Sequence, residues 1–242
     1  MNNDMIFQEK TFVKSSEANN QKELRLSSMF KMFQDATVMM VENLGFGKSK
    51  TMDKGYLWVI SRISIEITKM PKYLDNIIIE SYPENMIHFI YPMQFIIKYE
   101  DGSTALRISS IWALIDSDTR KTLFPSITNV FIKGISRDDR INRPKGINKQ
   151  DITLKEKRII RYSDTDMNGH LNNTRYFDFI QDMYGTKELN GYTIKKSEII
   201  FNKEAIEGDE LELYSSNNNE YFVGKVKDEQ CFEATIKLEK KK

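Results

Sequence analysis

The residues best suited to chemistry lie in one short polar segment, Tyr162–Asn173. Within it, Asp166, Asn168 and His170 occupy alternate positions, so an extended backbone would project all three side chains to one side. A carboxylate, an amide and an imidazole placed together can orient a water molecule, remove its proton and hold a carbonyl oxygen. The same residue types also form turns and cap helices, and this structural interpretation explains the composition without catalysis.

Other residues that often carry chemistry lack a supporting motif. Cys231 lies in an alternating C-terminal strand pattern, where a lone cysteine more often packs than reacts. His88 lies at a predicted turn or strand start, and no motif surrounds it, which favours a structural role. No Gly-x-Ser-x-Gly sequence occurs, which disfavours a serine hydrolase. One cysteine and two histidines are too few for a disulfide or an ordinary zinc site, so we expect no metal and no cofactor.

The chain contains an internal repeat. Phe12–Glu17 resembles Ile159–Asp164 at an offset of 147 residues. The same offset superposes Phe30–Asp35 on Phe177–Asp182, and both segments end in Gln-Asp. Because one offset serves both pairs of segments, we predict two similar units in tandem rather than one undivided domain.

The repeat helps to decide between the two interpretations of the polar segment. At this offset the three candidate residues Asp166, Asn168 and His170 correspond to Asn19, Gln21 and Glu23. The first unit therefore keeps a polar loop but lacks the imidazole. A loop needed only for structure has no reason to hold histidine in one copy alone. We predict that the second unit is catalytic and that the first serves as a scaffold or pocket.

The first unit is predicted to contain a long helix followed by strands. Ser27 or Ser28 can cap a helix over 29–44, and Gly45 then ends it. Apolar residues cover most of the circumference of this helix, so we expect a sheet to enclose it. Alternation typical of a strand begins at Arg62. Strand patterns occupy 58–67, 76–82, 89–99 and 105–115.

The second unit has the same order of elements in a shorter form. Asn173 or Thr174 can cap a short helix that ends at Gly185. Strand patterns lie near 193–203, 210–215, 221–227 and 231–238. A helix followed by antiparallel strands, twice in one chain, indicates the α+β class. A polar stretch at 136–151 indicates a linker, so the predicted divisions are 1–135, 136–152 and 153–242.

Charge and hydropathy exclude several other classes. A formal net charge of +1 provides no overall field that would attract nucleic acid. The longest apolar run, at 89–97, is interrupted by Pro92 and Gln94 and is far shorter than the roughly 20 residues of a membrane helix. The first residues lack the basic and apolar regions of a secretory signal. We therefore expect a cytoplasmic protein without membrane insertion.

The segment Tyr162–Tyr176, with its Asp-x-Asn-x-His-x-Asn-Asn core, resembles the second-repeat signature of acyl-acyl carrier protein (acyl-ACP) thioesterases of the bacterial and plant fatty-acid type. The first unit resembles that family's first-repeat pattern in the segments Gln34–Ala36, Leu44–Gly47, Gly55–Arg62 and Ser109–Asp116. The similarity covers nearly the whole chain. It implies a tandem hot-dog fold, in which each unit wraps an antiparallel sheet around a long helix, and it places an acyl pocket in the first unit without identifying the residues that line it.

The resemblance also implies a catalytic set of an Asp, an Asn and a His from the motif and a Glu from a following strand. The motif residues correspond to Asp166, Asn168 and His170. The Glu corresponds to Glu204, although Glu198 and Glu207 lie close to it in the sequence.

A second offset relates the two units around this Glu. Ile67–Asp75 lines up with Phe201–Asp209 at an offset of 134 residues, so Met70 of the first unit corresponds to Glu204. Plant members often have cysteine after the Glu, whereas this chain has Ala205. This difference argues against a cysteine nucleophile and leaves water as the attacking group.

The implied activity is hydrolysis of fatty acyl-ACP thioesters to free fatty acid and carrier protein. We expect His170 and Glu204 to orient and deprotonate water, Asn168 to hold the carbonyl or the water, and Asp166 to orient the loop. Backbone N–H groups at the start of the second helix are expected to stabilise the oxyanion. Two alternatives stay open. The first is an acyl-CoA thioesterase, because single hot-dog enzymes share a similar Tyr-x-Asp-Thr-Asp loop. The second is a noncatalytic acyl-binding protein.

The implied partner is an acyl carrier protein that bears a fatty acyl chain, and a homodimer is also compatible with the sequence. Basic residues of the linker could meet an acidic carrier protein or simply face solvent. These residues are Arg137, Arg140, Arg143, Lys145 and Lys149.

Overall fold

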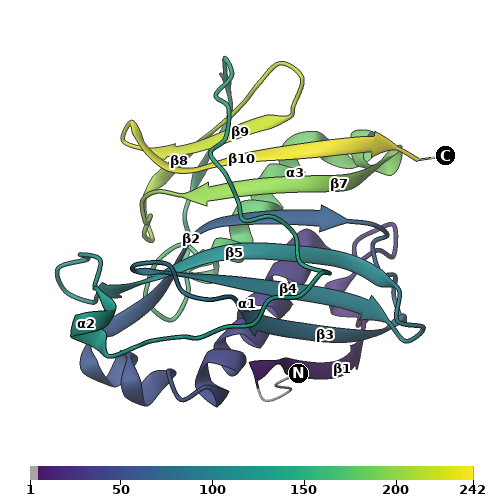
Figure 1. Ribbon diagram of the computed structural model, residues 1–242. Coiled ribbons are helices and arrows are strands. Elements are labelled where there is room, and N and C mark those ends of the chain that lie inside the picture. Colours follow the sequence, from purple (N-terminus) through teal and green to yellow (C-terminus); the bar gives the residue numbers. More distant parts are fainter. Residues whose placement is uncertain (1–4, 242) are drawn as a thin grey trace. The chain divides into compact units, whose positions relative to one another are not determined.

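The computed structural model describes residues 5–241, and the chain divides into two compact units (Figure 1). Unit 1 comprises Met1–Leu24 and Lys31–Pro144, and unit 2 comprises Arg25–Phe30 and Lys145–Lys242. No helix within 5–241 is long and apolar enough to cross a membrane. The boundaries proposed above for the linker, 136–152, remain a prediction.

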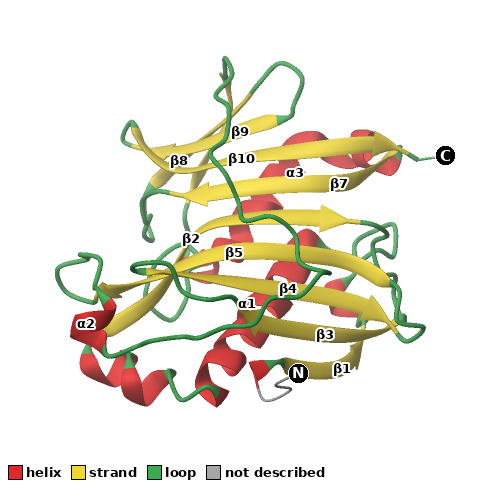
Figure 2. Cartoon of the chain, viewed as in Figure 1, coloured by secondary structure: helices red, strands yellow, loops and turns green. Residues whose placement is uncertain are grey.

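Unit 1 contains an antiparallel sheet with a long helix on one face. Its strands are β1 (Phe7–Phe12), β2 (Tyr56–Ile67), β3 (Asn76–Pro83), β4 (Ile90–Tyr99) and β5 (Thr104–Asp116). They pair in the order β1-β3-β4-β5-β2. The helix α1 (Leu26–Asn43), which belongs to unit 1 from Lys31 onward, lies across the sheet, as Figure 2 shows. Its residue Phe33 packs against Phe95 and Trp112. A single helical turn, α2 (Pro125–Thr128), follows β5.

Unit 2 repeats this arrangement. Its strands are β6 (Thr153–Ile159), β7 (Tyr192–Phe201), β8 (Glu210–Ser215), β9 (Tyr221–Val226) and β10 (Glu229–Lys240). They pair in the order β6-β8-β9-β10-β7, which is the order of unit 1 when the equivalent strands are matched. The helix α3 (Asn173–Asn190) packs on this sheet, where Tyr176 contacts Phe201 and Phe232. The predicted α+β class is confirmed.

The start of α1 differs from the sequence-based expectation. The helix begins at Leu26, so Ser27 and Ser28 lie inside its first turn and the predicted cap is wrong. Gly45 ends the helix as predicted, because it adopts a left-handed φ of 76° and its N–H bonds to the Glu42 carbonyl. The enclosure of α1 is incomplete, since Val38 and Met39 are 55% and 47% exposed.

The start and the end of α3 also differ from those predicted from the sequence. The cap is Asn172, one residue earlier than predicted, and its side-chain oxygen accepts the N–H of Thr174 at 3.0 Å. Gly185 interrupts the helix, with φ of 71° and ψ of 167°, but the predicted end of the helix at this residue is wrong. Helical residues then resume and continue to Asn190, so Gly185 marks a kink rather than the end of the element.

A β-bulge explains why alternation in the sequence begins only at Arg62. In the pairing of β2 with β5, Ile60 faces Trp112 and Arg62 faces Ile111, so Ser61 is the additional residue. The period-2 pattern is regular after this residue and is shifted before it. The strand itself already begins at Tyr56.

The two units share their loop geometry residue by residue. The 3₁₀ turns η2 (Ser15–Glu17) and η5 (Tyr162–Asp164) lie at equivalent positions. Isolated bridges follow the same offsets, with Ala18–Leu24 matching Thr165–Leu171 and Glu23–Lys72 matching His170–Ile206. The repeat inferred from weak sequence similarity is therefore a repeat of backbone conformation and of hydrogen bonding.

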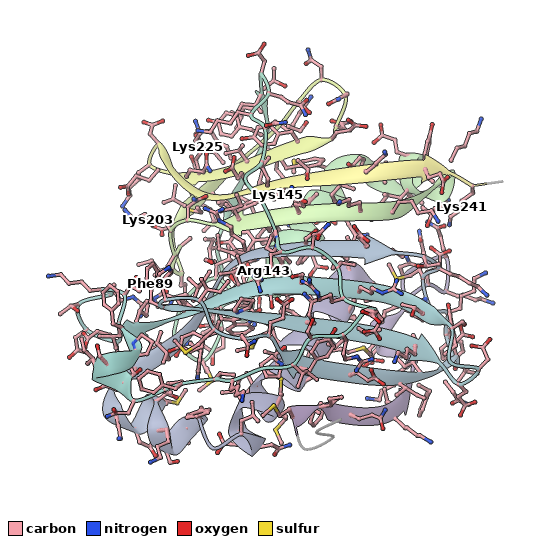
Figure 3. All side chains as sticks on the ribbon, viewed as in Figure 1. Phe89, Arg143, Lys145, Lys203, Lys225 and Lys241 are labelled. Atoms are coloured by element: carbon pink, nitrogen blue, oxygen red, sulfur yellow. The ribbon has the colours of Figure 1, made fainter. Side chains whose placement is uncertain are left out.

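Much of the basic stretch assigned to the linker is bound to unit 1. Arg143, labelled in Figure 3, donates through Nε to the buried carboxylate of Glu84 at 2.9 Å. The Gln94 side chain, which is fully buried, bonds to both Glu84 and the Ile141 carbonyl. Arg137 pairs with Glu80 and Asp139. These two arginines therefore neutralise carboxylates of their own unit, and a contact of this stretch with an acidic carrier protein stays a prediction.

Close contact between this stretch and unit 1 requires a glycine at position 134. A Cβ atom on Gly134 would lie 2.2 Å from the backbone carbon of Glu84. The N–H of Gly134 donates to the side chain of Asn85, and the N–H of Ile135 donates to the Pro83 carbonyl. The segment after α2 is thus held against the end of β3.

Candidate active site

The candidate catalytic loop of unit 2 is held in shape by Asp166. Its carboxylate oxygen Oδ1 accepts the backbone N–H groups of Asn168 at 2.8 Å and His170 at 3.2 Å. Its own N–H donates to the His170 carbonyl at 2.8 Å, and Gly169 adopts a left-handed φ of 79° at the tip. These bonds fold the chain back on itself and leave Asn168 exposed at the turn.

A second loop, which follows β7, brings Glu204 to the imidazole. His170 and Ile206 form an antiparallel bridge, and Leu171 N–H donates to the Ala205 carbonyl at 2.8 Å. As a result, His170 Nε2 lies 3.5 Å from Glu204 Oε2. The two side chains are 26% and 42% exposed, so the pair is open to solvent and to substrate. The separation suits an ion pair and is longer than a strong hydrogen bond.

The three glutamates considered from the sequence occupy different places. Glu204 is the one that lies within ion-pair distance of His170. Glu198 is in the middle of β7, opposite Thr235 of β10. Glu207 is exposed in the turn that precedes β8. The structure therefore brings together Asp166, Asn168, His170 and Glu204 on two adjoining loops.

A buried carboxylate supports the loop from below, and sequence reasoning did not assign it this role. Asp164 is 7% exposed, and its Oδ1 accepts Nε of Arg175 at 3.0 Å. Its Oδ2 accepts the N–H of Arg161 at 3.1 Å, and its carbonyl accepts the N–H of Asn172. Arg175 also pairs with Asp178, three residues later in α3. A cation in the first turn of a helix is disfavoured by the helix dipole. The position of Arg175 there is the sequence signal that it has carboxylate partners.

Unit 1 contains the same loop without the reactive groups. The side chain of Asn19 accepts the N–H groups of Gln21 and Glu23 at 2.9 and 3.0 Å, as Asp166 does for its own loop. Glu23 stands where unit 2 has His170, and Met70 stands where it has Glu204. The loop conformation therefore does not depend on histidine or on the paired glutamate.

The remaining candidates lie in structural positions. Cys231 is buried, and burial raises the pKa of its thiol to about 11, which opposes a role as a nucleophile at neutral pH. Ala205, at the position of the plant cysteine, is also buried. His88 has φ of 53° in a tight turn closed by an Ile87–Ile90 bridge. Within the described part of the chain, no group of three or more His, Cys, Asp or Glu residues could hold a metal ion.

Two helix-in-sheet units, of which one carries a His–Glu pair beside a polar loop, define a double hot-dog protein. The model of the acyl-ACP thioesterase N-terminal domain matches residues 4–132, and that of the C-terminal domain matches residues 147–240. The chain therefore belongs to the acyl-ACP thioesterase family, as the sequence resemblance implied.

Solved structures show the same fold. An acyl-ACP thioesterase from Bacteroides thetaiotaomicron superposes with a TM-score of 0.87 at 22% identity and covers 97% of this chain and 98% of its own. The 12:0-ACP thioesterase from Umbellularia californica gives a TM-score of 0.80 at 17% identity, with 98% of each chain covered. The predicted tandem hot-dog fold is confirmed.

Plant proteins are among the curated relatives. Oleoyl-acyl carrier protein thioesterase 2 of Arabidopsis thaliana is 26% identical over 227 residues, which cover 80% of this chain and 59% of the relative. Acyl-[acyl-carrier-protein] hydrolase FATB3 of Cuphea viscosissima is 22% identical over 209 residues, which cover 78% of this chain and 50% of the relative. The chain thus spans between half and three fifths of the length of these relatives.

Proposed function

We propose that this protein hydrolyses fatty acyl-ACP thioesters to a free fatty acid and the carrier protein. Membership of the acyl-ACP thioesterase family supports the substrate class. The observation that carries the proposal is the His170–Glu204 pair at 3.5 Å, which stands at a position where the otherwise matching loop of unit 1 has no imidazole.

In this reaction His170 acts as the general base. It takes a proton from water, the oxygen of that water attacks the thioester carbonyl, and Glu204 balances the positive charge on the imidazole. The carbon–sulfur bond then breaks, and the electron pair leaves with the sulfur. A thiol with a pKa of about 8.5 is a good leaving group, so the demanding step is water attack and not protonation of the sulfur.

The side-chain amide of Asn168 is the proposed donor to the developing oxyanion. Backbone donors around it are already engaged, because the N–H groups of Asn168, Gly169 and His170 all bond to Asp166. At the start of α3, the Thr174 N–H is taken by the cap residue Asn172. The N–H groups of these four residues are thus engaged within the protein, which favours the exposed side-chain amide of Asn168 as the donor.

Asp166 acts in this scheme by positioning the loop. Its Oδ1 atom accepts the backbone N–H groups of Asn168 and His170, and Asn19 makes the same bonds in unit 1. The chemical steps therefore fall to His170, Glu204 and Asn168.

The test is release of free thiol from matched acyl-ACP and acyl-CoA substrates by the purified protein. His170→Ala should lower kcat about 10²- to 10⁴-fold, the range for loss of a general base. Turnover close to that of the unchanged protein would overturn the assignment of His170. A higher kcat/KM for acyl-CoA would overturn the preference for the carrier protein, and tight acyl binding without turnover would identify a noncatalytic binding protein.

A further inference from the structure

The loops around the candidate catalytic pair expose three large apolar side chains. Tyr162 is 80% exposed, Met167 is 82% exposed and Ile206 is 51% exposed. We refer to Tyr162, Met167 and Ile206 as the apolar rim. Single exposed apolar side chains are ordinary on a protein surface, but three of them in the loops that hold a reactive pair favour a surface that binds a ligand.

The internal repeat shows that the loop fold does not need these side chains. At the positions of Tyr162, Met167 and Ile206, unit 1 has Ser15, Asn20 and Lys72. The backbone conformation is nevertheless the same in both units, because the two sets of 3₁₀ turns and bridges coincide at the same offsets.

Unit 1 exposes a different pair of apolar residues in its own loop. These are Tyr73 and Leu74, at positions where unit 2 has Glu207 and Gly208.

The residues of the apolar rim lie in the same two loops as the reactive groups. Met167 lies between Asp166 and Asn168 in the chain. Ile206 is the bridge partner of His170 and follows Glu204 by two residues. Tyr162 opens the same loop, and its carbonyl accepts the Thr165 N–H at 3.1 Å.

We propose that the apolar rim binds the uncharged, amide-bearing pantetheine arm that carries the thioester. This inference rests on the proposed function, because it assumes that an acyl thioester reaches His170. The acyl chain is apolar along its whole length, so burial in the interior of the protein is more favourable for it than contact with this exposed surface. The arm is the part of the substrate that stays outside, next to the reacting carbonyl.

The charges beside the rim favour an uncharged occupant. Glu204 and Glu207 are exposed in the same loop as Ile206, and Asp166 adjoins Met167. Lys203, labelled in Figure 3, pairs with Glu229 and so does not offset these carboxylates. Beside Met167 and Ile206 an anionic group would be repelled, whereas the methylene and amide groups of pantetheine would not. The exposed Arg161 lies at the other end of the rim, next to Tyr162.

Unit 1 supplies substitutions that this loop conformation accepts. The test variant is Tyr162→Ser with Met167→Asn, which installs the residues of unit 1 at both positions. The control is Leu74→Asn, since Leu74 is 60% exposed in unit 1 and has φ of 68°, a conformation that asparagine tolerates. Each protein is assayed with one acyl chain on three carriers, which are the holo-carrier protein, free pantetheine and ethanethiol.

The double variant should raise KM about tenfold for acyl-pantetheine and acyl-ACP alike, with kcat within about twofold, because it removes ground-state contacts with the arm. Hydrolysis of the ethanethiol ester, which has no arm, should be unchanged, and the control should match the unchanged protein on all three substrates. Direct titration with a nonhydrolysable acyl-pantetheine thioether should show the same loss of affinity.

Three results would overturn the inference. An unchanged KM for acyl-pantetheine would show that the rim does not bind the arm. A loss confined to acyl-ACP would assign the rim to the body of the carrier protein. An equal loss on the ethanethiol ester would show that the substitutions disturb the reactive groups. If the unchanged protein hydrolyses none of the three esters, the proposed function itself fails, which is a separate outcome.

Discussion

Asp166 and Asn19 make the same pair of hydrogen bonds in the two units of this chain. Asp166 Oδ1 accepts the N–H groups two and four residues later at 2.8 and 3.2 Å, and Asn19 Oδ1 does so at 2.9 and 3.0 Å. An amide oxygen therefore suffices to fold this loop, and a negative charge is not required for its shape.

This equivalence predicts the effect of changing Asp166. Asp166→Asn should keep the loop conformation and reduce kcat by less than about tenfold, because the side-chain oxygen that accepts both N–H groups is retained. Asp166→Ala should lose both bonds and about 1–3 kcal/mol of stability, measured by chemical denaturation. A loss of kcat above about 10³-fold for Asp166→Asn would show that the carboxylate takes part in the chemical step.

The ion pair with His170 predicts a different result for Glu204. Glu204→Met installs the residue of unit 1 and should lower kcat about 10- to 100-fold, because the imidazolium formed during water attack loses its counter-charge. The thermal unfolding midpoint should hardly change, since Glu204 is 42% exposed.

A neighbouring glutamate provides the control for this measurement. Glu207→Gln alters an exposed carboxylate in the same turn and should leave kcat unchanged. If Glu204→Met and Glu207→Gln behaved alike, the pairing of Glu204 with His170 would have no catalytic consequence.

The raised pKa of Cys231 predicts an unreactive thiol. With a pKa of about 11, the folded protein at pH 8 holds only about a thousandth of this thiol as thiolate. Iodoacetamide should therefore label Cys231 slowly in the native protein and rapidly in denaturant, as followed by mass spectrometry. Cys231→Ala should retain thioester hydrolysis, and loss of hydrolysis with the fold intact would reopen the question of a cysteine nucleophile.

Two carboxylates that pair with Arg137, Glu80 of β3 and Asp139 of the stretch 136–144 itself, predict an acid-sensitive stability. Burial opposes ionisation of Glu80 and Asp139, yet bonds and charges from Lys98 and Arg137 lower the pKa of both groups. A group with a lowered folded-state pKa stabilises the protein above its unfolded-state pKa, and this stability is lost as the pH falls through the folded-state value. Urea denaturation between pH 7 and pH 3 should show this decline.

Removal of the partner arginine tests the origin of the decline. Arg137→Met should cost about 1–3 kcal/mol near pH 7, and its difference from the unchanged protein should shrink in acid, where the carboxylates are protonated. Lys157→Met removes a cation from an exposed pair with Glu210 and Glu212 and should have no measurable effect. A difference that is constant with pH would show that Arg137 acts through packing rather than through charge.

Repetition and alternation made most of the fold predictable. Strands β3, β4, β5 and β8 lie within one residue of their predicted bounds, because period-2 patterns and turn residues mark them directly. The start of α1 was mispredicted because serine fits the first helical turn as well as the cap position. The bulge at Ser61 could not be predicted, because its only trace in the sequence is that the alternation of apolar and polar residues changes register there.

Contacts between residues far apart in the sequence were less accessible. Motif residues of the candidate site could be named from their types and spacing, and the repeat singled out His170. The support of the loop by Asp164 and Arg175 was missed, because both residues have ordinary local explanations as a turn former and a helix residue. The bond from Arg143 to the buried Glu84 could not be predicted, because no residue near Arg143 in the sequence indicates that partner.

Because the loop occurs twice in this chain, the copy in unit 1 serves as an internal control for the copy in unit 2. For any residue from Tyr162 to Asp209 that lies on the matched turns and bridges, unit 1 shows which alternative the same backbone already accommodates. Exchanging residues between the two copies can therefore separate what the conformation demands from what the reaction demands, without recourse to a second protein. The reverse exchange, which transfers histidine and glutamate to Glu23 and Met70, asks how few side chains distinguish an inert loop from a reactive one.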